Sequence, residues 1–228
     1  MSDPNDLPLD ADSGIEERPQ NRREWSGVLR SLLLPALIVA TIVGGLFYLQ
    51  RRDSGGSGNN SGFGIVALPT EANATGKSPS TDVGRAAPDF LLETPDGRQL
   101  RFSDLRGKPV LVNFWASWCT PCRQEMPEIV RAYDAHQKDG LVVVGVDLQE
   151  NDGQVRDFAQ EFGMKFPIVI DRNGGVGQAW HIGGPIQGIP SSYFIDATGV
   201  VRARNFGPMT ADVIEQNLAT ILGAQPGT

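Results

Sequence analysis

Short, nearly continuous apolar runs alternate with apolar stripes at helical spacing over the second half of the chain. The runs Val110–Trp115 and Leu141–Val146 contain almost no polar residues, which is typical of strands that are covered on both faces. An apolar stripe follows each run and predicts a helix there. The stripes consist of Met126, Ile129, Val130 and Tyr133, and of Val155, Phe158, Ala159 and Phe162 after a start signal at Asn151–Asp152.

Further elements are predicted on both sides of this β-α-β-α core. Phe90–Glu93 and Gln99–Phe102 flank the turn Pro95–Gly97, which predicts a hairpin. Residues 166–170, 192–195 and 200–205 predict three more strands, with a turn at 198–199 between the last two. A closing helix follows Thr210 and is expected to bury Val213, Ile214, Leu218 and Ile221. This order predicts an α/β domain whose sheet carries helices on both faces.

An uncharged stretch near the N-terminus has a different pattern. Ser31–Gln50 lies between Arg30 and Arg51 and holds no charged residue. A helix of this length is about 30 Å long, which matches the hydrocarbon core of a bilayer. A cleaved signal peptide usually has a shorter apolar core and a small-residue cleavage site. We therefore expect residues 31–50 to be a retained transmembrane helix.

The charges beside this stretch predict its orientation and the organisation of the whole chain. More basic residues precede it than follow it: Arg18, Arg22, Arg23 and Arg30 against Arg51 and Arg52. This favours a cytoplasmic N-terminus and an extracytoplasmic C-terminal part, and thus a single-pass protein of the cell membrane. We expect a disordered acidic tail at 1–30, a flexible linker at 51–81 with a weak strand signal at 63–68, and one domain at 82–228.

Composition excludes several classes of protein. The 228 residues carry 20 basic and 27 acidic side chains, for a net charge of −7, which argues against a nucleic-acid partner. The chain has only two Cys and two His. A multi-disulfide scaffold, a four-Cys zinc site and a three-His site are therefore impossible, and we expect no metal and no cofactor.

The two cysteines carry the candidate chemistry. Cys119 and Cys122 follow directly after the predicted strand and begin the predicted helix. A helix start stabilises a thiolate and lowers its pKa. We expect Cys119 to be exposed and to attack a partner disulfide, and Cys122 to be more buried and to resolve the mixed disulfide. A structural disulfide, or half of a metal site completed by His136 or His181, remain alternative interpretations of the pair alone.

The surrounding segment resembles a known family. NFWASWCTPCRQEMP is similar to the active-site segment of the thioredoxin superfamily, in particular of its membrane-anchored TlpA/ResA-like thiol–disulfide oxidoreductases. The resemblance covers about residues 85–224 and includes APDFLLETPDGRQLRFSDLRGKPVLVNFWA and GIPSSYFIDATGVV. It implies a thioredoxin-like fold with an N-terminal β-hairpin and a central insert around Val155–Gly175, here preceded by a single transmembrane helix.

Three positions acquire a role from this resemblance. Pro190 resembles the family's cis-proline beside the disulfide, and Ile189 before it would offer its backbone to an extended substrate. Glu125 lies one helical turn after Cys122 and matches an active-site glutamate, which could move a proton to or from the buried thiol. Asn113 stands where thioredoxin itself has a buried aspartate, and it cannot ionise.

The residues around the cysteines complete the predicted site. Trp118 is expected to form part of the docking surface together with Thr120 and Pro121, whereas Trp115 is expected in the core. Pro121 also fits the first turn of a helix, where its missing N–H costs little. His181 precedes the Pro190 loop and could be an ordinary loop residue or lie near the site. His136 is expected to be solvated.

The sequence therefore predicts a membrane-tethered, extracytoplasmic protein-disulfide reductase. The resemblance implies client proteins with disulfides, such as apocytochrome c, and reduction by an integral-membrane thiol donor. A disulfide oxidase or isomerase would use the same cysteines, because the direction depends on the reduction potential. A non-catalytic metal-delivery module is a further alternative. A peroxidase is disfavoured, since no Pro-x-x-x-Thr-x-x-Cys signature precedes Cys119.

Overall fold

The computed structural model describes residues 41, 44, 62–182 and 188–223 of the chain. Within these residues the strands are β1 (Gly64–Ile65), β2 (Phe90–Glu93), β3 (Gln99–Arg101), β4 (Val110–Trp115), β5 (Val142–Leu148), β6 (Ile168–Asp171), β7 (Ser191–Ile195) and β8 (Val201–Phe206). The α-helices are α2 (Thr120–His136), α3 (Asp152–Phe162), α4 (Gly175–Ala179) and α5 (Ala211–Leu222). Single turns of 3₁₀ helix lie at Thr70–Ala72, Phe102–Leu105 and Gln137–Asp139.

One mixed sheet forms the centre of the described domain. Its strand order is β1-β2-β6-β5-β4-β7-β8, with β3 paired to β2 outside this path. Strands β4, β5 and β6 are parallel, as expected for strands joined by helical crossovers. Strand β7 runs antiparallel to β4, with Ser191 opposite Phe114. The C-terminal end of β4 and the N-terminal end of β7 therefore lie side by side at the same end of the sheet.

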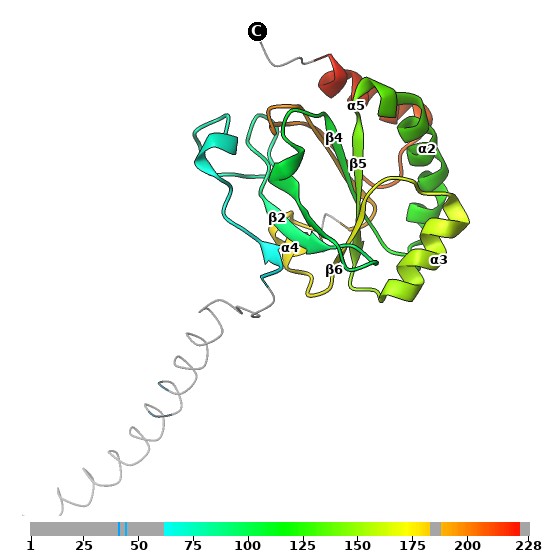
Figure 1. Cartoon of the computed structure of the whole chain (residues 1–228), viewed down its shortest axis with the longest axis horizontal. Helices are drawn as coiled ribbons and strands as arrows, with labels where there is room; N and C mark the ends of the chain where they lie inside the picture. The colour runs from blue at the N-terminus through cyan, green and yellow to red at the C-terminus, as the bar shows by residue number, and fades with distance from the viewer. Residues whose placement is uncertain (1–40, 42–43, 45–61, 183–187, 224–228) are drawn as a thin grey trace, which may run out of the picture. The chain divides into compact units, whose positions relative to one another are not determined.

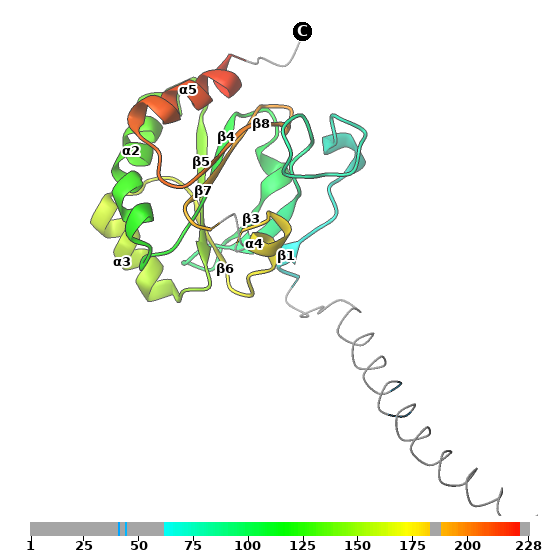
Figure 2. The ribbon, with the colours of Figure 1, turned by 180° about the vertical axis from the view of Figure 1, so that it is seen from behind.

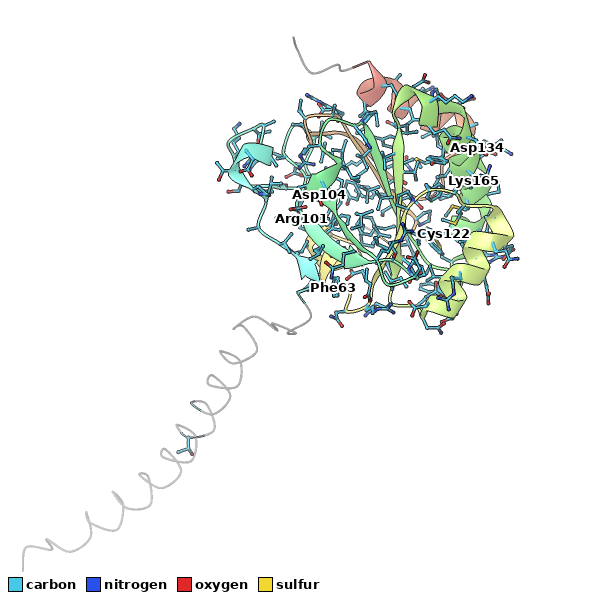
Figure 3. All side chains as sticks on the ribbon, viewed as in Figure 1. Phe63, Arg101, Asp104, Cys122, Asp134 and Lys165 are labelled. Atoms are coloured by element: carbon cyan, nitrogen blue, oxygen red, sulfur yellow. A yellow bond between two sulfur atoms is a disulfide. The ribbon has the colours of Figure 1, made fainter. Side chains whose placement is uncertain are left out.

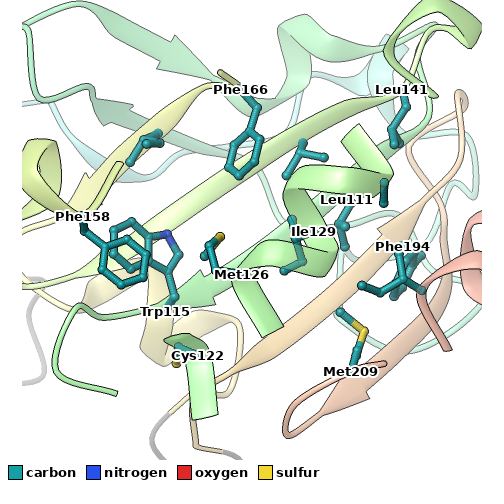
Figure 4. Close-up of a cluster of buried hydrophobic side chains, with 14 of the residues drawn as sticks. Leu111, Trp115, Cys122, Met126, Ile129, Leu141, Phe158, Phe166, Phe194 and Met209 are labelled. Carbon is teal, nitrogen blue, oxygen red and sulfur yellow. The ribbon is translucent and has the colours of Figure 1, made fainter. Parts of the chain in front are cut away.

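Helices cover both faces of this sheet, as the sequence predicts. Figures 1 and 2 show α2, α3 and α5 together on one face, and the short helix α4 on the other. On the first face, Trp115 stacks on Phe158 with ring centroids 4.3 Å apart, and the same cluster includes Met126 and Ile129 of α2 (Figure 4). The second face holds an aromatic cluster of Phe90, Phe102, Phe114, Trp180 and Tyr193. Because β4 supplies both clusters in alternation, all six of its residues are buried.

The observed bounds confirm the predicted elements with small corrections. Strand β6 begins at Ile168 rather than 166, since Pro167 has no N–H to donate to a ladder. Strand β3 ends at Arg101, because the carboxylate of Asp89 accepts the N–H of Ser103 and starts a 3₁₀ turn there. The sequence analysis missed α4, whose five residues are too few to show an apolar stripe.

The predicted flexible linker at 51–81 is wrong over its second part. Strand β1 pairs with β2, with Gly64 opposite Leu91. The guanidinium of Arg101 donates to the carbonyl of Ala67 at 2.9 Å, and the N–H of Ser80 donates to Ala86 at 2.9 Å. Residues 62–81 are thus part of the folded domain.

The predicted transmembrane helix falls outside the described residues, apart from Thr41 and Gly44. Within the described part of the chain, no helix has both the length and the apolar character needed to cross a bilayer. The predicted acidic tail at 1–30 also lies outside the described residues.

His136 joins α2 to α5 and is not simply solvated as predicted. Its Nε2 lies 3.0 Å from Glu215 of α5, and its Nδ1 lies 3.1 Å from Asp139. Partial burial opposes the charged ring, but hydrogen bonds to Glu215 and Asp139 outweigh it and raise the pKa of His136. The charged imidazole therefore pairs with the carboxylates of Asp139 and Glu215, and the pair with Glu215 links α2 to α5.

This bridge makes part of the stability depend on pH. A His whose pKa is raised on folding contributes stability that is present below its unfolded pKa of about 6.5 and is lost as pH rises through the folded value. We expect His136→Gln to lower the free energy of unfolding at pH 5.5 by about 0.5–1 kcal/mol, and to have a smaller effect at pH 9. Urea unfolding of both proteins at the two pH values measures this. An equal loss at both would show that packing, and not charge, is responsible.

Candidate functional site

Cys119 and Cys122 form a disulfide at the start of α2, with Cα atoms 5.2 Å apart. Strand β4 ends at Trp115, and a turn closed by the N–H of Cys119 donating to Ala116 leads into the helix. Figure 4 shows Cys122 on the first turn of the helix, on the side of the buried cluster. Figure 3 labels the same residue among the other side chains of the domain. The predicted exchange pair thus lies at the predicted strand–helix junction.

Cys119 is the N-cap of α2. Its sulfur accepts the N–H of Cys122 at 3.2 Å, and its carbonyl accepts the N–H of Arg123 at 3.1 Å. The first N–H groups of a helix have no partner within the helix, so they can stabilise a negative sulfur. Pro121 lies in the first turn, where its missing N–H costs little. This geometry favours a reactive thiolate at Cys119 after reduction.

The expected exposure of Cys119 needs a correction. Cys119 is only 4% exposed and Cys122 is fully buried. Cys119 is more exposed than Cys122, as predicted, but Cys119 is not open to solvent. The bond to Cys122 draws its sulfur toward the helix, and Cys119 belongs to the buried cluster against which Ile189 packs.

The Ile189–Pro190 peptide bond is cis, as the resemblance implies. Pro190 directly precedes β7, and its carbonyl accepts the N–H of Gly207 at 2.9 Å. The hydroxyl of Ser191 donates to the carbonyl of Gly188 at 2.6 Å and closes the turn. Because the start of β7 adjoins the end of β4, this turn lies at the same end of the sheet as the cysteines.

Glu125 lies in the interior and has a perturbed pKa. The residue is 1% exposed. Its carboxylate accepts the amide of Asn113 at 2.8 Å and the backbone N–H of Met209 at 3.0 Å. Burial raises the pKa of Glu125 to about 7, against the two hydrogen bonds, which favour the charged form. A carboxyl that titrates near neutrality, one turn from Cys122, can both take up and return a proton.

Asn113 hydrogen-bonds to the Glu125 carboxylate, but its amide cannot take up a proton in place of that carboxylate. Its amide nitrogen donates to Glu125 and also to Ser192 at 2.9 Å, while its own Oδ1 has no partner among the described residues. Sequence reasoning did not identify Ser192 or Met209 as neighbours of the site. The Met209 contact is made by a backbone N–H, which carries no residue-type signal.

The remaining predicted residues divide into two groups. Trp118 is 69% exposed and Thr120 is exposed beside it, so both are available for docking. His181 instead lies near Asp82, whose pKa is lowered first by a hydrogen bond from Ser80 and further by Arg204 and His181. Asp82 lies in the segment that precedes β2, so nothing in the structure assigns His181 a part in the exchange.

A pair of buried carboxyls near the site was missed. Asp147 at the end of β5 and Glu150 just after it are both buried. Both oxygens of Glu150 accept hydrogen bonds from Ser117, one from its backbone N–H and one from its hydroxyl. The sequence held one signal for this pair: two acidic residues lie at the end of a parallel strand, and that end is beside the end of β4.

No group of three or more His, Cys, Asp or Glu is placed to hold a metal ion in the part of the chain that the structure describes. The two cysteines are joined to each other within that part. The arrangement therefore supports two-electron sulfur chemistry at one disulfide.

Comparisons with known proteins agree with this chemistry. The family model described as AhpC/TSA family matches residues 83–204. The chain is 40% identical over 150 residues to the thiol-disulfide oxidoreductase ResA of Geobacillus thermodenitrificans (strain NG80-2), covering 66% of this chain and 84% of the relative. It is 38% identical over 138 residues to the thioredoxin-like protein YneN of Bacillus subtilis (strain 168), covering 59% and 78%.

A solved structure shows the same architecture. The crystal structure of a thiol:disulfide interchange protein of the thioredoxin family from Chlorobium tepidum TLS superposes with a TM-score of 0.55 at 31% identity. The superposition covers 64% of this chain and 99% of the Chlorobium tepidum chain. The family match at 83–204 contains the strands β2 to β7, the helices α2 to α4 and the disulfide described above.

Proposed function

This chain belongs to the AhpC/TSA family and is a thiol–disulfide oxidoreductase of the ResA type, and we propose that it works as a membrane-tethered reductant of client disulfides. The observation that carries the proposal is the Cys119–Cys122 disulfide at the start of α2, with Glu125 buried one turn behind it. Cys119, Cys122 and Glu125 lie within two turns at the start of α2, which supports roles as nucleophile, resolving thiol and proton acceptor.

The exchange proceeds in two steps. The Cys119 thiolate attacks one sulfur of a client disulfide, forms a mixed disulfide and releases one client thiolate. Cys122 then loses its proton to Glu125 and attacks the Cys119 sulfur, which releases the second client thiolate. Two electrons pass from the dithiol to the client, and the Cys119–Cys122 disulfide seen in the structure is the product.

The client is proposed to bind in an extended conformation beside Pro190. The Ile189 backbone before the cis bond would pair with the client chain as a short added strand. Trp118 offers an exposed apolar ring next to Cys119, and Thr120 and Pro121 complete the rim.

The direction of exchange is tested by the reduction potential of the full chain. Equilibration with a glutathione or dithiothreitol buffer gives the ratio of disulfide to dithiol. A potential at or below about −220 mV is expected for a reductant fed by a stronger thiol donor. A potential between about −120 and −180 mV would instead show an oxidase or isomerase and overturn the reductase proposal.

Residues 31–50 are proposed to anchor the catalytic domain outside the cytoplasm. The uncharged length of this stretch and the excess of arginine before it support this orientation. Protease added to spheroplasts that express the full chain should degrade the domain and leave a cytoplasmic control protein intact. Protection of the domain would overturn this proposal but would leave the exchange chemistry untouched.

Apocytochrome c is the proposed client, and an integral-membrane thiol protein is the proposed donor. Both follow from membership of the ResA-type oxidoreductases. In a bacterial host that lacks its own oxidoreductase of this type, the wild-type chain should restore c-type cytochromes and Cys119→Ser should not. Failure of the wild type, with the chain expressed and reduced, would point to another client.

A further inference from the structure

Ser117 links the cysteine turn to a buried carboxylate of the neighbouring strand. Ser117 lies two residues before Cys119, in the turn between β4 and α2. Its backbone N–H donates to one oxygen of Glu150 and its hydroxyl donates to the other. Both donors of one residue are thus held by both acceptors of another, which restricts the turn in position and in orientation.

Glu150 is in turn fixed by Asp147. The backbone N–H of Glu150 donates to Oδ1 of Asp147 at 3.0 Å. Gln149 between them adopts φ 65°, a left-handed conformation that is unusual for a residue other than glycine. A backbone held in this conformation indicates that the surrounding contacts determine the path of residues 147–150.

Asp147 is the unsatisfied member of the pair. It is fully buried, and its Oδ2 has no hydrogen-bond partner among the described residues. The pKa of Asp147 is raised to about 8, mainly by burial and in part by the neighbouring carboxyl of Glu150. Two buried carboxyls side by side cannot both ionise at low cost, so one keeps its proton near neutrality.

We propose that Glu150 is a positioning residue for Cys119, which it serves by holding Ser117, and that a proton retained on Asp147 preserves that contact. The juxtaposition of Asp147, Glu150 and Ser117 at the adjoining ends of β5 and β4 carries this inference. The proposal rests on thiol–disulfide exchange at Cys119, and it is independent of the direction of that exchange.

Other charges face the pair from each neighbouring element. Arg172, after β6, lowers the pKa of Asp147, and it is shared with Asp152 at 2.6 Å and Glu93 at 3.6 Å. From α2, Arg123 donates to the carbonyl of Ser117 at 3.3 Å and pairs with Glu161 of α3. Asp171 of β6 is buried but accepts the N–H of Gly177 at 2.7 Å. Glu150 therefore supplies the carboxylate contact to the cysteine turn, and Arg172 limits how readily Asp147 keeps its proton.

The first test compares the disulfide–dithiol equilibrium of full-chain variants in glutathione buffer at pH 7. Loosening the turn lowers the effective concentration of Cys119 at Cys122, and so favours the dithiol. Glu150→Gln is expected to shift the equilibrium constant about tenfold toward the dithiol, as for a lost charge-assisted hydrogen bond. Ser117→Ala loses only the hydroxyl contact, and a shift of about threefold in the same direction is expected.

Asp171→Asn is the matched control, because it neutralises a buried carboxyl at the end of the next strand without touching Ser117. It should stay within about twofold of the wild type. A shift in Glu150→Gln with none in Ser117→Ala would mean that charge alone acts, and would overturn the proposal. Where Glu150→Gln does not fold, Ser117→Ala decides by itself. All these comparisons are relative to the wild type, so they hold whatever its absolute potential.

The second test follows the amide proton of Ser117 by NMR between pH 6 and 10. In the wild type its chemical shift should move with the ionisation of Asp147, since a second charge disturbs the Glu150 contact. In Asp147→Asn that movement should disappear while the unfolding midpoint stays close to the wild type. An unchanged titration in Asp147→Asn would overturn the role given to the Asp147 proton.

Discussion

Cys119→Ser is expected to abolish disulfide reduction, with a loss of at least about a thousandfold in kcat/KM. The hydroxyl of serine does not ionise near neutrality, so the helix start has no anion to stabilise and no sulfur–sulfur bond can form. Reduction of a disulfide-linked peptide by the prereduced full chain measures the effect. The side chain lies at the N-cap of α2, where serine is itself a favoured residue, so the fold should persist.

Cys122→Ser is the matched control, since it makes the same substitution three residues later. The first attack should then proceed and the mixed disulfide should not be resolved. Mass spectrometry should find the client peptide bound to Cys119, which the wild type releases. A Cys119→Ser protein that kept its activity, or that trapped the peptide on Cys122, would contradict the assigned roles.

The strands and main helices could be predicted because their signals are local. The apolar run of β4, the stripe of α2 and the capping residue Thr210 each reflect a short stretch of sequence. The cysteine pair could be predicted for the same reason, since its position after a strand and before a helix is a property of one segment. The cis conformation at Pro190 came from the resemblance and not from the residues alone.

The folded segment at 62–81 could not be predicted from composition. Glycine and serine dominate the residues before it, whereas its own contacts are made by backbone atoms with Arg101 and with β2. A backbone donor or acceptor has no sequence signature, so such a docking is visible only once the partner strand is placed. The same limit hid the contact between Met209 and Glu125.

The burial of the acidic residues also could not be predicted from the sequence. Glu125 and Asp147 look like ordinary charges along the chain, and only the packed sheet shows that both are withdrawn from water. Burial raises the pKa of Glu125 to about 7 and that of Asp147 to about 8. Both carboxyls lie near the end of the sheet that carries the disulfide, so the site can hold protons close to neutrality.

Glu125→Gln is expected to slow disulfide reduction by about a hundredfold at pH 7, the usual contribution of a positioned proton acceptor. The wild-type rate should rise with pH through about 7 as Glu125 ionises. The glutamine amide cannot accept the proton of Cys122, so this rise should be absent in the variant. The difference should narrow at high pH, where Cys122 ionises unaided. Single-turnover reduction of a peptide disulfide from pH 5 to 10 measures both profiles.

Stability separates this role from a purely structural one. Glu125 has a folded pKa of about 7, above the usual 4.5 of a glutamate, so the folded state holds the proton and the free energy of unfolding falls as pH rises from 4.5 to 7. Glu125→Gln removes the buried charge, and Oδ1 of Asn113, which has no partner among the described residues, can accept from the new amide if the Asn113 side chain rotates. The variant should therefore gain about 2 kcal/mol over the wild type at pH 8, and nothing at pH 4. A glutamate kept only for packing would instead show a loss of stability at pH 8 and an unchanged pH–rate profile.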